Sequence, residues 1–154
     1  MKKSLLLISI VLLVISATID LEAGSFVTAQ SAILIDAETG QVLYSKNMNQ
    51  LRSPASTTKI MTGILAVENG DLREQVAATI RAAHEGGSSI YLSPGEKLTL
   101  EELIYGLLIK SGNDAAVAIA EHIAGSVASF AEMMNLKAKQ IGALNTNFKN
   151  PNGL

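Results

Sequence analysis

The segment from Ser56 to Lys59 has the sequence Ser-Thr-Thr-Lys and places a hydroxyl and an amine three residues apart. In a helix, residues i and i+3 lie on the same face, so the two groups would be neighbours. Serine becomes a good nucleophile when a nearby base takes its proton, and a partly buried lysine with a lowered pKa can be that base. Backbone N–H groups at a helix N-terminus would stabilise the negative charge that develops in acyl transfer. The pair indicates an acyl-transfer site, but an ordinary capped helix with a surface lysine has the same pattern.

A second polar cluster, Ser111-Gly112-Asn113, lies at the break between two apolar segments. Ser111 can relay a proton, and Asn113 can hydrogen-bond a substrate amide. Taken alone, the cluster is also typical of a turn in which Asn113 caps the next helix. Because both motifs stand at helix edges, together they favour an active site.

Four helices are predicted to position these residues. Their ends are marked by N-cap residues, a capping box and glycine stops. The predicted helices run from Ser53-Pro54 to Asn69-Gly70, from Thr99 (with Glu102) to Lys110–Gly112, from Asn113 or Asp114 to Gly125, and from about Ser129 to Ile141.

Strand-like segments come before the first helix. Residues 31–36 and 41–44 flank a turn that ends at Gly40, which predicts an antiparallel hairpin. A two-stranded ribbon is marginally stable in water, so we expect these strands to belong to a larger sheet. Residues 76–80 are a further strand candidate, and residues 88–92 are expected to form a loop or a short strand.

Composition excludes several classes of protein. The 154 residues suit one domain, and with 48% apolar and 17% charged residues the chain can bury a core. A net charge of -2 gives no basic field for nucleic acid, so we expect no nucleic-acid partner. The chain has no cysteine, and His84 and His122 are not at metal-ligand spacing. We expect neither a metal nor a cofactor.

The first residues resemble a secretory leader. Lys2 and Lys3 precede an apolar run over residues 5–17, and small residues at Ala23 and Ala29 suit a cleavage site. An uncleaved membrane anchor is the alternative, but the run is shorter than the roughly 20 apolar residues that span a bilayer. We expect a signal peptide over residues 1–29, cleaved near 23–29, and export to the cell envelope.

Several linked motifs carry a resemblance to a known family. They cover nearly all of the chain after the leader and resemble the serine-type D-Ala-D-Ala carboxypeptidases, which are the low-molecular-mass penicillin-binding proteins. The motifs are Ile33-Leu34-Ile35-Asp36, Gly40-x-Val42-Leu43-Tyr44, Ser53-Pro-Ala-Ser-Thr-Thr-Lys-Ile-Met-Thr62, Gly87-Ser-Ser89, Gly95-Glu96, Tyr105-Gly-Leu-Leu108, Ser111-Gly-Asn-Asp-Ala-Ala116, Asn145 to Phe148, and Asn150-Pro-Asn-Gly-Leu154.

The resemblance implies an α+β, β-lactamase/transpeptidase-like (penicilloyl-serine transferase) fold, with a helical subdomain beside an antiparallel sheet. It implies that Ser56 is the acylated nucleophile, Lys59 its base, Ser111 a proton relay and Asn113 a substrate-binding residue. The implied reaction removes the terminal D-alanine from a peptidoglycan stem peptide, and β-lactams would inhibit it covalently on the same serine.

One family motif, Lys-Thr-Gly, does not occur in this sequence. We therefore expect residues 30–154 to be the N-terminal part of a longer catalytic domain, incomplete at its C-terminus, which folds poorly or dimerises. A later segment would supply any membrane association. Two alternatives remain: a class A-like serine β-lactamase, although Gly112 stands where such enzymes typically carry Asp, and a noncatalytic wall-binding domain.

Overall fold

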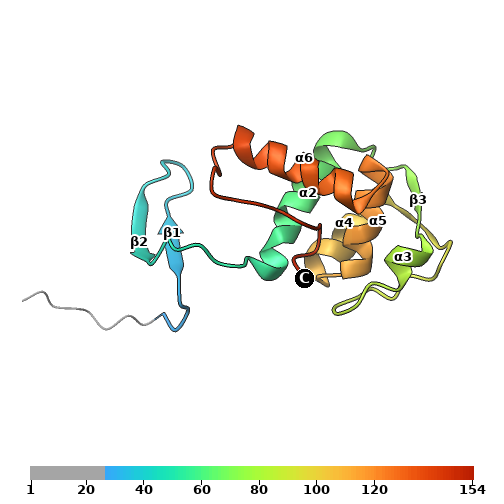
Figure 1. Ribbon diagram of the computed structural model, residues 1–154, viewed down its shortest axis with the longest axis horizontal. Helices are drawn as coiled ribbons and strands as arrows, with labels where there is room; N and C mark the ends of the chain where they lie inside the picture. Colours follow the sequence, from blue (N-terminus) through green and yellow to red (C-terminus); the bar gives the residue numbers. More distant parts are fainter. Residues whose placement is uncertain (1–26) are drawn as a thin grey trace, which may run out of the picture. The chain divides into compact units, whose positions relative to one another are not determined.

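The computed structural model describes residues 27–154, which fall into two compact units divided after Gln50. The expected signal peptide falls mainly on residues 1–26, outside the described residues. Within the described part, no helix has the length and apolar character needed to cross a membrane. The elements, labelled in Figure 1, are β1 (Ala32–Ile35), β2 (Val42–Lys46), η1 (Ala55–Thr57), α2 (Thr58–Asn69), β3 (Gln75–Ala77), α3 (Ile80–Ala83), β4 (Lys97–Thr99), α4 (Leu100–Ile109), α5 (Asn113–Ala124) and α6 (Val127–Gln140).

The first unit contains the predicted hairpin. Strands β1 and β2 pair antiparallel, with Ala32 opposite Lys46 and an irregularity after Leu34. At the turn, the Asp36 carboxylate accepts hydrogen bonds from the Thr39 hydroxyl (2.7 Å) and backbone N–H (2.8 Å), which hold the pKa of Asp36 below its usual value. Among residues 27–154 no third strand pairs with this hairpin, so the larger sheet expected from the sequence is not formed there.

The second unit is a helical core around α5. The first eight residues of α5, from Asn113 to Ala120, are all buried. Helices α2, α4 and α6 pack against α5 (Figure 1). Small side chains on α5 let these neighbours approach closely, and Phe130 and Leu107 fill the space between the helices without exposure to solvent. The predicted third helix, with its stop at Gly125, is confirmed.

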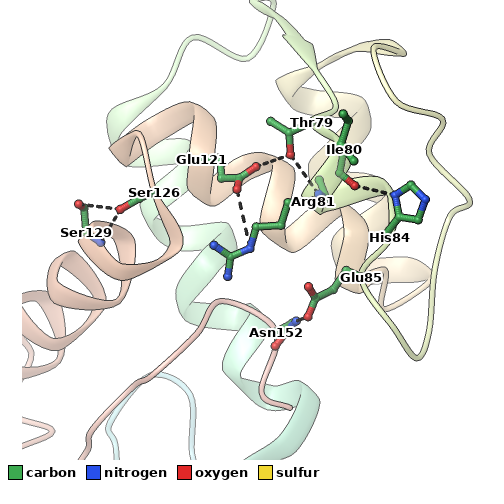
Figure 2. Close-up of polar contacts among 10 residues, drawn as sticks. Thr79, Ile80, Arg81, His84, Glu85, Glu121, Ser126, Ser129 and Asn152 are labelled. Carbon is green, nitrogen blue, oxygen red and sulfur yellow. Dashed lines mark hydrogen bonds and ion pairs between the residues drawn. The ribbon is translucent and has the colours of Figure 1, made fainter.

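Two predicted helix starts are wrong by a few residues. The first helix does not begin at Ser53-Pro54: the chain makes a single 3-10 turn, η1, before α2. The cause lies at Ala55, whose φ of +48° is incompatible with a regular first α-helical turn. The fourth helix begins at Val127, earlier than expected, because Ser126 caps it by accepting a hydrogen bond from the Ser129 N–H (Figure 2).

Short elements connect α2 to α4. Of the strand candidate at residues 76–80, only the first part is a strand, because Thr79 caps a helical turn, α3, that begins at Ile80 (Figure 2). The partner of β3 is β4, an element that the sequence analysis missed. Residues 88–92 form a loop, one of the two predicted outcomes.

The predicted capping box at the start of α4 yields a stability prediction. The Thr99 hydroxyl accepts from the Glu102 N–H (3.2 Å), and the Glu102 carboxylate accepts from the Thr99 N–H (2.8 Å). Thr99→Ala leaves the Glu102 N–H without this partner, so we expect the free energy of unfolding to fall by about 1 kcal/mol. Urea denaturation measures it, and an unchanged midpoint would contradict the assigned role of the cap.

Candidate functional site

The structure brings Ser56, Lys59 and Ser111 together within the second unit. The Lys59 Nζ donates to Ser111 Oγ (3.1 Å) and lies 3.5 Å from Ser56 Oγ. Its third partner is the backbone carbonyl of Asn152, at 3.2 Å. An ammonium group has three donors, so these acceptors match its capacity. A neutral amine has a free lone pair, which can take the proton of the Ser56 hydroxyl.

Burial sets the electrostatics of Lys59. The residue is 3% exposed, and desolvation lowers its pKa below the ordinary 10.5. The groups that contact Nζ are two hydroxyls and a carbonyl, none of which carries a charge to offset the burial. A larger fraction of Lys59 is therefore neutral at a given pH than for an exposed lysine, as a general base requires.

A cavity of about 270 Å³ opens beside these groups. Its wall combines both candidate hydroxyls, the Lys59 side chain and apolar residues of α2 and α4. The lining residues are Ser56, Thr57, Lys59, Ile60, Leu107, Leu108 and Ser111. A carbonyl compound that enters this cavity can reach Ser56 and the base together.

Unusual backbone conformations lie at both reactive hydroxyls. Ser111 has a φ of +57°, and Ala55, directly before Ser56, has a φ of +48°. Such left-handed conformations are costly for residues other than glycine and persist where the surroundings enforce them. Both serine side chains therefore project from turns and not from a regular α-helix.

The fourth candidate, Asn113, makes its side-chain contact away from Lys59. It is 3% exposed, and its Nδ2 donates to the Gly86 carbonyl at 2.6 Å. Its backbone N–H donates to the Ser88 carbonyl at 2.7 Å. Asn113 thus joins the start of α5 to the loop over residues 86–92, and its substrate-binding role stays a prediction.

Sequence reasoning missed the role of Asn152. Its carbonyl contacts Lys59, and its Nδ2 donates to Glu85 Oε1 at 2.8 Å (Figure 2). The C-terminal segment returns to α2, where Thr62 Oγ1 donates to the Pro151 carbonyl at 2.7 Å. No side-chain pattern could reveal a contact made by a backbone carbonyl. The only available signal was the Asn150-Pro-Asn-Gly-Leu154 motif itself.

The remaining polar candidates lie apart from the Lys59 contacts. His84 contacts the Ile80 carbonyl of its own turn (Figure 2), and Tyr91 is 87% exposed. His122 lies 3.2 Å from the Glu74 carboxylate.

Gly153 keeps the C-terminal segment close to η1. Its φ is +86°, and a Cβ at this position would lie 2.0 Å from the Ala55 carbonyl oxygen. Gly153→Ala must push the segment, with Asn152, away from Lys59. Gly142→Ala is a matched control, because Gly142 has a similar φ of +83° but open space around its Cβ position.

We expect Gly142→Ala to lower the free energy of unfolding by about 1 kcal/mol through backbone strain alone, and Gly153→Ala to cost clearly more. Urea unfolding of both variants measures the difference. Equal losses would contradict the close approach of the segment to η1.

Comparisons with known proteins place these features in a family. The model of the D-alanyl-D-alanine carboxypeptidase family matches residues 18–154. A D-alanyl-D-alanine carboxypeptidase of Bacillus subtilis, DacF, is 50% identical over 131 residues, which are 82% of this chain and 34% of DacF. DacA of Haemophilus influenzae, also a D-alanyl-D-alanine carboxypeptidase, is 38% identical over 136 residues, which are 83% of this chain and 35% of DacA.

Solved structures share the fold. The D-alanyl-D-alanine carboxypeptidase DacD from Francisella tularensis matches with a TM-score of 0.80 and 41% identity, over 83% of this chain and 32% of that one. Penicillin-binding protein 5 from Haemophilus influenzae matches with a TM-score of 0.77 and 36% identity, over 83% of this chain and 40% of that one. These matches confirm the expected α+β fold of the penicilloyl-serine transferases. The chain spans about a third of the length of these curated relatives.

Proposed function

This chain belongs to the D-alanyl-D-alanine carboxypeptidase family, and we propose that it supplies the nucleophile, base and proton relay that remove the terminal D-alanine from peptidoglycan stem peptides. The observation that carries the proposal is the buried Lys59 amine, which contacts the hydroxyls of both Ser56 and Ser111. Acyl transfer needs this set of groups: a nucleophile, a base beside it and a second hydroxyl that can pass the proton on.

The reaction follows from that arrangement. Neutral Lys59 takes the Ser56 hydroxyl proton as Ser56 Oγ attacks the carbonyl carbon between the two D-alanines. The tetrahedral intermediate collapses, the C–N bond breaks, and the proton passes from Lys59 through Ser111 to the leaving amine of D-alanine. Water then adds to the Ser56 ester with Lys59 again as base, which releases the shortened peptide and restores the serine.

Binding and location complete the proposal. Asn113 hydrogen-bonds the substrate amide after it exchanges its contact with Gly86. β-Lactams mimic the substrate and acylate Ser56. No metal or cofactor enters any step. The protein acts outside the cytoplasmic membrane, in the cell envelope, after the leader over residues 1–29 directs its export.

A hybrid protein tests the proposal, because this chain covers about a third of its relatives. The chain is joined to the part of Bacillus subtilis DacF that it does not cover, and D-alanine release from an acylated tripeptide ending in D-Ala-D-Ala is measured. The same peptide ending in L-Ala-L-Ala is the control. We expect D-alanine from the first peptide only, together with a long-lived penicillin adduct.

Two other results would overturn this function. Fast turnover of penicillin without a lasting adduct would identify a serine β-lactamase. A well-folded hybrid that neither releases D-alanine nor binds penicillin would identify a noncatalytic wall-binding domain.

A further inference from the structure

We propose that Asp114 is a positioning residue for this site, which it serves by holding the loop over residues 86–92 (the docking loop) against the start of α5. The inference deepens the proposed function and rests on it. Nothing in the reaction above uses Asp114, and yet it is among the most completely hydrogen-bonded side chains near the site.

The Asp114 carboxylate is fully buried and accepts hydrogen bonds from four residues. Three of these donors belong to the docking loop: Ser89 Oγ at 2.6 Å, and the backbone N–H groups of Ile90 and Leu92, each at 3.1 Å. The fourth is the Ala115 N–H at 2.9 Å. Burial alone would raise the pKa of Asp114, but these hydrogen bonds outweigh it and hold the pKa below its usual value. The carboxylate is therefore ionised at neutral pH, and each of its donors is a neutral group.

The docking loop contacts Asn113, and the residue directly before it contacts Asn152. The carbonyl groups of Gly86 and Ser88 accept from the Asn113 side chain and backbone. Glu85, directly before the loop, accepts from the side chain of Asn152 (Figure 2). The backbone carbonyl of Asn152 contacts Lys59. The backbone of residues 85–92 and its hydrogen bonds thus connect Asp114 to Asn113 and, through Asn152, to the Lys59 amine.

Asp114 also supports the turn that carries Ser111. A Cβ on Gly112 would lie 2.9 Å from Asp114 Oδ1, so the carboxylate lies directly behind this turn. The left-handed φ of Ser111 needs rigid surroundings to persist. A loosened carboxylate would free both the turn and the docking loop, and the hydroxyl of Ser111 would lose its fixed place beside Lys59.

Substitutions at both ends of the shortest hydrogen bond to Asp114, the one from Ser89, test the proposal in the hybrid protein. Ser89→Ala removes one donor, Ser89→Thr keeps the hydroxyl, and Asp114→Asn removes the charge. Thr99→Ala is the stability control, because it weakens a helix cap in the same unit without touching the Asp114 contacts. The rate constant for acylation by a fluorescent penicillin is measured separately from the affinity of the first complex, at a temperature at which every variant is folded.

We expect the acylation rate constant to fall about 100-fold in Asp114→Asn and about tenfold in Ser89→Ala, with the affinity of the first complex unchanged. Ser89→Thr should restore most of the rate, and Thr99→Ala should leave it unchanged. Equal rates in the folded parent, Asp114→Asn and Ser89→Ala would overturn the proposal, as would a loss in Thr99→Ala of the same size.

A second measurement separates this inference from the proposed function. The Lys59 amine is titrated by NMR in the hybrid protein. Its Nζ faces the uncharged groups of Ser56, Ser111 and Asn152, with the Glu85 carboxylate one hydrogen bond behind Asn152. Because burial lowers its pKa, a loosened docking loop should raise that pKa toward 10.5 in Asp114→Asn and Ser89→Ala but not in Thr99→Ala. If the parent is not acylated, the proposed function fails, and the titration alone decides the inference. An unchanged Lys59 pKa in both Asp114→Asn and Ser89→Ala would then refute the positioning role of Asp114.

Discussion

Replacement of Ser56 by alanine is expected to abolish acylation by penicillin and release of D-alanine in the hybrid protein. Ser56 Oγ lies 3.5 Å from the candidate base, and both line the same cavity. Loss of a serine nucleophile typically lowers the rate of acyl transfer by about six orders of magnitude, so no fluorescent band should remain on a gel. The variant should fold like the parent, because Ser56 is exposed.

A neighbouring serine supplies the matched control for this substitution. Ser53→Ala removes a hydroxyl that is also exposed and lies only three residues away in the sequence, but outside the Lys59 contacts. We expect this variant to be labelled like the parent. Label retained by Ser56→Ala, or lost equally in both variants, would contradict the assignment of Ser56.

Replacement of Lys59 by glutamine should slow acylation by about three orders of magnitude, the middle of the range for a general base. Glutamine retains amide donors for Ser111 and the Asn152 carbonyl but cannot accept the Ser56 proton in the same way. Lys59→Arg should be as slow, because a guanidinium stays protonated. Stopped-flow measurements of penicillin acylation compare both variants with the parent, and a loss smaller than tenfold in either would exclude Lys59 as the base.

The pH dependence of the same reaction follows from the lowered pKa of Lys59. Only neutral Lys59 can take the proton, so acylation by the parent should rise with pH and level off above a pKa lower than 10.5. Lys59→Gln should lack this rise.

The same lowered pKa affects the free energy of unfolding. At pH values between the folded and the unfolded pKa of Lys59, the unfolded chain binds more protons than the folded chain. This lysine therefore makes the free energy of unfolding increase with pH in that interval.

Local patterns in the sequence were enough to predict much of the helical core. The i, i+3 spacing of Ser56 and Lys59, the capping box of Thr99 and Glu102, and the stop at Gly125 each depend on neighbours within a few residues. Each of these features can be recognised in a short segment of the sequence, and the structure confirms all three. The break between α4 and α5 likewise places Ser111 beside Lys59, as the combination of the two motifs indicated.

The remaining features depend on contacts between distant segments. Two contacts produce no recognisable pattern in the local sequence: the one between the Asn152 carbonyl and Lys59, and the one between the Ser89 hydroxyl and Asp114. In each pair the two residues lie tens of positions apart in the sequence. The left-handed Ala55 that shifts the start of α2 is a tertiary effect of the same kind, since the carbonyl of Ala55 lies against Gly153. Side-chain type predicts such contacts poorly, as two of these partners are backbone carbonyls.

The most direct test of the account is to locate the penicillin adduct in the hybrid protein by mass spectrometry after trypsin digestion. Cleavage after Arg52 and Lys59 isolates residues 53–59, and cleavage after Lys110 and Lys137 isolates residues 111–137. We expect the added mass on the first fragment, with fragmentation spectra that place it on Ser56. An adduct on Ser111 or elsewhere, or a folded hybrid without any adduct, would contradict the central claim that Ser56 is the nucleophile.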